Sequence, residues 1–157
     1  MERTEGTFFV TEADDESAIL TDVADGQVHT LAEQADPPLE QGEVLVGTLV
    51  AEPPMTVAYS IEELDSRRTI PVERSPESPT KQEREIAADQ PVGELTREPR
   101  AGEGEIHVLT VPEEQTDQAV ADVLDDPQTV ARAARLGVNR VEIRAEGGVL
   151  SVRYLPN

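Results

Sequence analysis

The fold is decided by residues 105–155, which read EIHVLTVPEEQTDQAVADVLDDPQTVARAARLGVNRVEIRAEGGVLSVRYL. Residues 106–111 are predicted to form a strand, and residues 116–124 carry apolar side chains at helical spacing. Asp126 and Pro127 are typical of the N-cap and the first position of a second helix, and Gly137 is typical of its end. This part of the chain therefore begins with a strand followed by two helices.

Two further runs, residues 141–145 and 149–154, flank a Gly-Gly pair that predicts a hairpin turn. In that register Glu142 lies directly across from Arg153, and apolar residues share the opposite face. We therefore expect one face of the hairpin to be core and the other to face water. The complete order is βααββ, with a three-stranded sheet.

A capping-box pattern precedes this unit, because Thr80 is followed three residues later by Glu83. It predicts a leading helix from Lys81 and a C-terminal α+β domain over residues 81–157. Residues 74–80 are rich in Ser and Pro, which favour neither a strand nor a helix, so we interpret them as a linker.

Residues 1–73 contain five or six strand-like runs separated by turn signals. Asp25 and Gly26 are a strong hairpin signal, and a two-residue loop there would place His29 opposite Asp22 as a cross-strand ion pair. Short strands with one longer connection predict an acidic, small antiparallel β-barrel of OB-like arrangement. The predicted fold class of the whole chain is thus α+β.

Charge constrains the environment of the protein. The chain has 33 acidic and 13 basic residues, a formal net charge of -20, and Lys81 as its only lysine. Such self-repulsion opposes compaction in dilute buffer but is screened at molar salt. We therefore expect a halophilic, cytoplasmic protein. The longest apolar run, residues 44–51, is too short and too interrupted to span a membrane, and the absence of cysteine fits a reducing compartment.

Motifs that carry chemistry are missing from the sequence. There is no nucleophile elbow, phosphate-binding glycine loop or calcium loop, and acidic pairs are too widespread to mark a site. We therefore expect no enzyme activity, catalytic residue, metal or cofactor. An alternative is a hydrolase or isomerase with an interdomain site at His107.

Arginines are concentrated near the C-terminus, and they form a candidate partner-binding face. One interpretation pairs them with neighbouring acids, as surface ion pairs do for little net energy; the other is a strip that binds phosphates. The arginines of this face are Arg132, Arg135, Arg140, Arg144 and Arg153.

The strand–helix–helix–strand–strand order resembles the core of a KH-type RNA-binding domain, a family that clamps nucleic acid with a Gly-x-x-Gly loop. Residues 125–128, Asp-Asp-Pro-Gln, stand where that loop would be, so no binding residue carries over. The whole chain resembles a family of uncharacterised haloarchaeal proteins in Gly6-Thr7-Phe8, in residues 104–108, and in residues 133–137 leading into Arg140-Val141. That resemblance implies a lineage and a compartment, and no activity.

From the sequence we expect a non-enzymatic binding or adaptor protein of a halophilic cytoplasm, with a protein as the favoured partner and no membrane association. The first alternative is an RNA- or ribosome-associated factor that uses the C-terminal arginine face. The second is the enzyme with a site at His107.

The net charge of -20 predicts that folding depends on salt. Raising KCl from about 0.1 M to about 3 M shortens the Debye length from roughly 10 Å to below roughly 3 Å, which screens the acidic self-repulsion. Thermal melts followed by circular dichroism should show stability rising steeply over this range. Full cooperative folding at low salt, with a melting temperature unchanged by KCl, would contradict the prediction.

Overall fold

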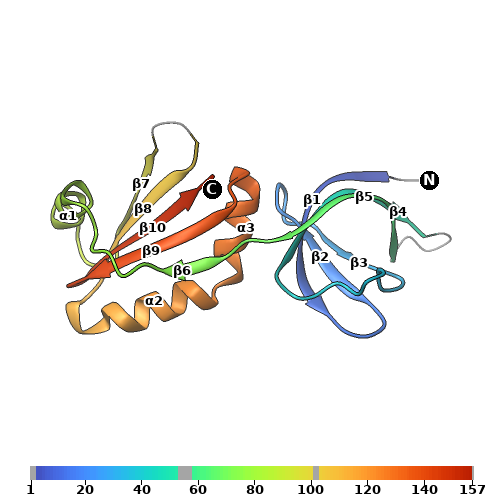
Figure 1. Cartoon of the computed structure of the whole chain (residues 1–157), viewed down its shortest axis with the longest axis horizontal. Helices are drawn as coiled ribbons and strands as arrows, with labels where there is room; N and C mark the ends of the chain where they lie inside the picture. Colours follow the sequence, from blue (N-terminus) through green and yellow to red (C-terminus); the bar gives the residue numbers. More distant parts are fainter. Residues whose placement is uncertain (1–2, 53–57, 101–102, 157) are drawn as a thin grey trace. The chain divides into compact units, whose positions relative to one another are not determined.

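The computed structural model describes residues 3–52, 58–100 and 103–156. In this part of the chain strands outnumber helices, and they form two five-stranded sheets accompanied by three α-helices (Figure 1). The mixed α+β class predicted from the sequence is confirmed. None of the described helices has the length and apolar content to span a bilayer.

The chain divides into two compact units. Unit 1 comprises residues 1–70 and 130–135, and unit 2 comprises residues 71–129 and 136–157. The predicted linker, residues 74–80, lies within unit 2 in this division; its first residue, Arg74, ends a short strand, and the others lead to the first helix.

Unit 1 contains an antiparallel sheet of order β3-β2-β1-β4-β5. One buried cluster packs on it, including Phe8, Leu20 and Leu45. The described edge strands β3 and β5 form no ladder with each other. A single parallel bridge joins Leu31, which follows β3, to Tyr59 of β5. The antiparallel sheet is as predicted, whereas the described residues of this unit form no closed barrel. The strands are β1 (Arg3–Ala13), β2 (Ala18–Asp22), β3 (Val28–Thr30), β4 (Glu43–Ala51) and β5 (Tyr59–Thr69).

The predicted register of the β2–β3 hairpin is wrong by two residues. His29 lies opposite Leu20 and not opposite Asp22. The reason is a longer turn: the N–H of Gly26 donates to the backbone oxygen of Asp22, and the Asp22 carboxylate accepts from the N–H of Ala24. Asp22 thus closes the turn and is not available as an ion-pair partner for His29.

Unit 2 contains a sheet of order β6-β9-β10-β8-β7, in which only β6 is parallel to its neighbour. The predicted hairpin register is confirmed, with Glu142 across from Arg153. The prediction of three strands is wrong, because β6 and β7 extend the sheet to five. The strands are β6 (Val72–Arg74), β7 (Leu95–Pro99), β8 (Glu105–Thr110), β9 (Arg140–Glu146) and β10 (Val149–Leu155).

Contacts between distant residues recruit the two added strands. The N–H of Val141 donates to Pro71 and the N–H of Ser75 donates to Ile143, which satisfies the free edge of β9. The Gln90 side chain accepts from Thr96 and donates to the backbone of β8, which fixes β7 in place. Propensity within these short polar segments does not reveal such bonds.

The helices begin where the sequence predicts. Thr80 accepts from the N–H of Glu83, and Glu83 accepts from the N–H of Thr80, so the capping box is complete. Gly137 ends the third helix with φ 76°. The helices are α1 (Lys81–Ala88), α2 (Thr116–Asp125) and α3 (Pro127–Leu136), with a 3-10 turn, η1 (Glu113–Gln115), before α2.

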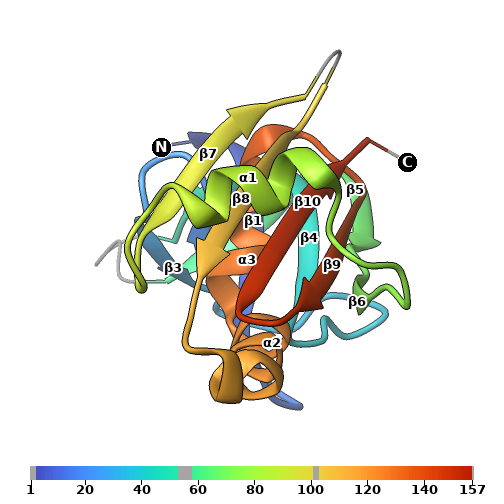
Figure 2. The same cartoon turned by 90° about the vertical axis from the view of Figure 1, so that its left-hand side faces the viewer.

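Both faces of the unit 2 sheet are covered. Val120 of α2 packs against Ile143 and Leu150 on one face. Helix α1 crosses β8 and β10 on the other face (Figure 2), where Val108 and Ser151 are fully buried. The expectation that the polar face of the hairpin is open to water is therefore wrong, because α1 packs over part of it.

Gly104 sits where the backbone leaves no room for a side chain. An added Cβ would collide with the backbone oxygen of Tyr154, and φ is 97°. Gly93 has a similar φ of 93° but open space around it. We expect Gly93→Ala to cost about 1 kcal/mol of unfolding free energy from backbone strain, and Gly104→Ala to cost at least about 3 kcal/mol because the β8–β10 pairing must also shift. Equal losses for the two variants in urea melts would contradict the close-approach argument.

Candidate functional site

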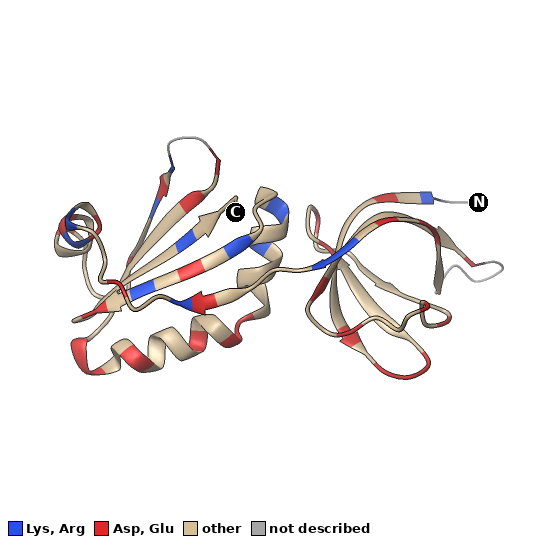
Figure 3. Ribbon diagram, viewed as in Figure 1, with Lys and Arg blue, Asp and Glu red and all other residues tan. Residues whose placement is uncertain are grey.

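The five predicted arginines divide between two places. Arg140 and Arg144 on β9 share one face of the unit 2 sheet with Arg153 on β10, and basic and acidic residues alternate along β9 (Figure 3). Arg132 and Arg135 lie in the segment of α3 that groups with unit 1. Within unit 2 the structure therefore brings together three of the five, and we call them, with Glu142 and Ser151, the arginine face.

Glu142 is the centre of the arginine face. Arg144 Nε donates to Glu142 Oε1 at 2.6 Å, and Arg140 Nη1 donates to Oε2 at 3.3 Å. Nη2 of the same arginine lies 2.9 Å from Glu77 Oε2. Arg140 and Arg144 are therefore both engaged with carboxylates of their own unit.

This pairing changes the ionisation of both partners. Burial opposes the charged form of Glu142, but the hydrogen bond and charge of Arg144, with help from Arg140 and Arg153, outweigh it and hold the pKa of Glu142 below its ordinary value. Burial likewise opposes the charge of Arg144, and the hydrogen bond and charge of Glu142, with Glu77 and Glu83, raise the pKa of Arg144. The network therefore stabilises both charges.

Arg153 differs from the other two arginines. Its side chain is 17% exposed, and Nη1 lies 3.7 Å from Oε2 of the buried Glu83, which is beyond hydrogen-bonding distance. Nε and Nη1 are buried and have no hydrogen-bond acceptor among the described residues. A buried donor left without an acceptor lowers the stability of the folded state by about 1–3 kcal/mol, so the position of Arg153 is energetically unfavourable.

Arg153 lines a cavity of about 340 Å³ between α1 and the end of the β7–β8 hairpin, which we call the α1 groove. Its walls combine two arginines, two glutamates and an apolar floor. The sequence gives no signal for this groove, because the capping box reveals one role of Glu83 and not the position of its second oxygen near Arg153. The lining residues are Thr80, Gln82, Glu83, Ile86, Glu98, Pro99, Arg100, Ile106, Val108 and Arg153.

Both histidines are buried. His107 is 2% exposed, with Nε2 3.1 Å from Glu105 Oε1 and its ring 4.9 Å from that of Tyr154. His29 is 3% exposed and lies between the rings of Phe8 and Tyr59. No group of three His, Asp or Glu side chains in the described ranges is arranged to hold a metal ion.

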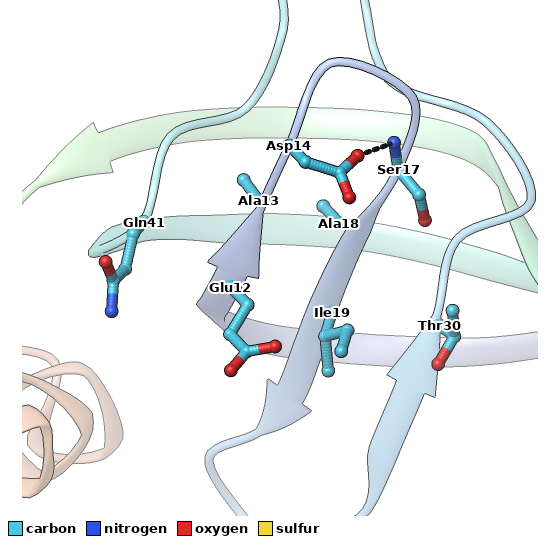
Figure 4. Close-up of a pocket in the computed structure, with 8 residues that line it drawn as sticks. All are labelled: Glu12, Ala13, Asp14, Ser17, Ala18, Ile19, Thr30 and Gln41. Carbon is cyan, nitrogen blue, oxygen red and sulfur yellow. Dashed lines mark hydrogen bonds between the residues drawn. The ribbon is translucent and has the colours of Figure 1, made fainter.

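A second cavity, of about 590 Å³, lies at the β1–β2 turn of unit 1 (Figure 4). Asp14 is turned toward Ser17 there, and its Oδ1 accepts from the N–H groups of Glu16 and Ser17, both at 2.8 Å. The carboxylate is thus used to close the turn, and the described residues that line the cavity include no cationic side chain. We therefore take the α1 groove as the candidate site.

The Glu142 network predicts a specific pH dependence. Because the pKa of Glu142 is lowered by folding, its contribution to stability is present above its unfolded pKa, near 4.3, and is lost as the pH falls through the lower folded value. Glu142→Gln should cost about 2 kcal/mol at pH 7, and the difference from wild type should shrink as the pH falls from about 5 to 3. Urea melts at several pH values measure this difference.

The control variant is Glu73→Gln, which removes an equal charge from the exposed paired position on β6. It should cost far less at pH 7. A Glu142→Gln penalty that stays constant down to pH 3 would show that the network does not depend on the charge of Glu142.

Comparison with known proteins supplies a family for this chain. No curated protein and no solved structure matches it. A family model described as a family of unknown function (DUF5812) matches residues 4–145, which is most of the sequence. The expected membership of an uncharacterised family is confirmed: the chain belongs to the family of unknown function DUF5812.

Proposed function

We propose that this chain is a non-enzymatic binding protein, an adaptor that holds a segment of a protein partner in the α1 groove. One observation carries the proposal: the groove places the guanidinium of Arg153 beside an apolar floor, and two of its donors have no acceptor among the described residues. Specific binding sites typically combine a mostly apolar cleft with a few such polar groups. A volume of about 340 Å³ suits a short segment.

The lining of the groove favours a protein as the partner. Arg100 and Arg153 are matched by Glu83 and Glu98, so the charged side chains of the groove cancel. A nucleic acid carries a charge on every phosphate and needs a clear cationic excess, whereas a polypeptide segment combines apolar and polar groups as this groove does. Arg140 and Arg144, which the RNA alternative requires, are engaged with Glu142.

The enzyme alternative has less support. A general base must come within hydrogen-bonding reach of its substrate, and His107 is 2% exposed and already lies against Glu105. Its position against the Tyr154 ring is that of a core residue.

We extend the proposal to the setting of the protein. The excess of 33 acidic over 13 basic residues supports a halophilic, cytoplasmic protein of haloarchaeal lineage. The strand order of unit 1, with a parallel bridge between Leu31 and Tyr59 at its edges, supports a partly open OB-like barrel. The βααββ order of residues 105–155 supports the KH-like comparison, without the glycine clamp.

Site-directed photocrosslinking tests the partner and its location. The chain has no cysteine, so single cysteines can carry a benzophenone label. Gln82→Cys places the label on the rim of the α1 groove, and Gln118→Cys places it on exposed α2 over the other face of the sheet. At molar KCl we expect one protein, identified by mass spectrometry, to crosslink from position 82 and not from 118. The purified partner should bind the Arg153→Leu variant at least tenfold more weakly.

Two results would reject this function. Equal crosslinking from positions 82 and 118 would show that the groove is not the binding site. Recovery of RNA by wild type, lost when Arg140, Arg144 and Arg153 are all changed to Ser, would promote the RNA-associated alternative.

A further inference from the structure

The charged groups of the α1 groove are unequally satisfied. Glu83 Oε1 accepts from the N–H of Thr80 at 2.8 Å, and Arg100 Nη1 donates to the backbone oxygen of Glu103 at 2.7 Å. Arg153 has only the 3.7 Å approach of Glu83, and its Nε and Nη1 have no acceptor in the described part of the chain. Arg153 therefore brings to the groove two N–H donors that have no acceptor among the described residues, and such donors are what a site for an oxyanion requires.

We infer that the α1 groove binds a monoanionic carboxylate joined to an aliphatic group, with the carboxylate on the guanidinium of Arg153. Guanidinium and carboxylate match in geometry, since two parallel N–H donors meet two oxygens. The inference rests on the proposed binding function and specifies its ligand chemistry.

The charge of the site selects a carboxylate over a phosphate. Glu83 and Glu98 line the same cavity as Arg153 and Arg100, so an incoming dianion would bring two charges into a neutral site that already holds two carboxylates. A single negative charge needs only the unsatisfied edge of Arg153. Uncompensated charge in a partly buried site is costly, so the monoanion is favoured.

The aliphatic part of the ligand is selected by the remaining walls. Ile86 of α1, Pro99 of β7, and Ile106 and Val108 of β8 line the groove together with Arg153. Ile106 is opposite Arg153 in the sheet register, so an apolar surface adjoins the guanidinium directly. A ligand with its carboxylate on Arg153 can lay a branched aliphatic side chain on this surface. Two sources share this chemistry: a free small acid, and the C-terminal Leu, Ile or Val of a polypeptide.

Titration with matched small molecules tests the ligand chemistry. N-acetylleucine carries both features, N-acetylleucine amide lacks only the charge, and inorganic phosphate lacks the aliphatic group. In NMR spectra of the ¹³C- and ¹⁵N-labelled full chain, N-acetylleucine should shift the Arg153 side-chain Nε–H signal and the methyl signals of Ile106 and Val108. The amide should bind at least tenfold more weakly, and phosphate should not move these methyl signals.

Variants connect the binding to the assigned residues. Arg153→Gln should weaken binding of N-acetylleucine at least tenfold, and Arg153→Lys should restore only part of it, because a lysine lacks the two-donor edge. Arg97→Gln is the matched control, since it removes an exposed arginine from the opposite face of β7 and should leave binding within twofold. If the Arg153 variants fail to fold, Arg100→Gln tests the same groove and should weaken binding at least threefold.

A peptide ending in leucine, compared with its C-terminal amide, separates the two sources. Tighter binding of the free peptide than of N-acetylleucine identifies a polypeptide terminus, and the reverse order identifies a small acid; the carboxylate assignment stands in both cases. Equal binding of acid and amide, stronger binding of phosphate, or no binding would overturn it. If it fails while crosslinking from position 82 still succeeds, the protein-binding function stands with a different ligand chemistry. Binding of the acid without any crosslinked protein would instead reject the function alone.

Discussion

The second unit depends on the position of one buried carboxylate, that of Glu83. One of its oxygens closes the capping box that starts α1, and the other faces Arg153 on β10. The first contact fixes where the helix begins, and the second places the negative charge of Glu83 near the positive charge of Arg153 on the sheet. The preceding segment is held in the same way, since Glu77 contacts Arg144. Together with the buried Ala87 of α1, these contacts turn a polar sheet face into a covered layer.

Local signals in the sequence predicted the local structure well. The capping box, the Asp126-Pro127 helix start and the Gly147-Gly148 hairpin each depend on residues close together in the chain, so they could be read directly. The five-stranded sheet and the covering of part of the arginine face depend on contacts between residues far apart, such as Ser75 with Ile143. No local pattern encodes those contacts, and Arg153 could therefore be placed on the correct face without its environment being predicted.

The same limit explains the histidines. The Asp25-Gly26 pair correctly marks a turn, but the length of the turn is set by the Asp22 carboxylate. Because the turn contains two residues more than expected, His29 lies opposite Leu20 and not opposite Asp22. His29 instead packs between Phe8 and Tyr59, which come from strands on either side in the sequence. The family has no known activity that would point to a site. The α1 groove is therefore marked only by the geometry of its side chains.

The parallel pairing of β6 with β9 has a consequence for the order of folding. Val72 can pair only after Val141 has been synthesised. Likewise, Glu77 and Glu83 have no arginine partner until β9 and β10 are present. Closing so long a loop carries an entropic penalty before any contact repays it, which slows folding. On a ribosome the α1 segment would leave the exit tunnel well before its partners, so the groove can take shape only after the last strands have been synthesised.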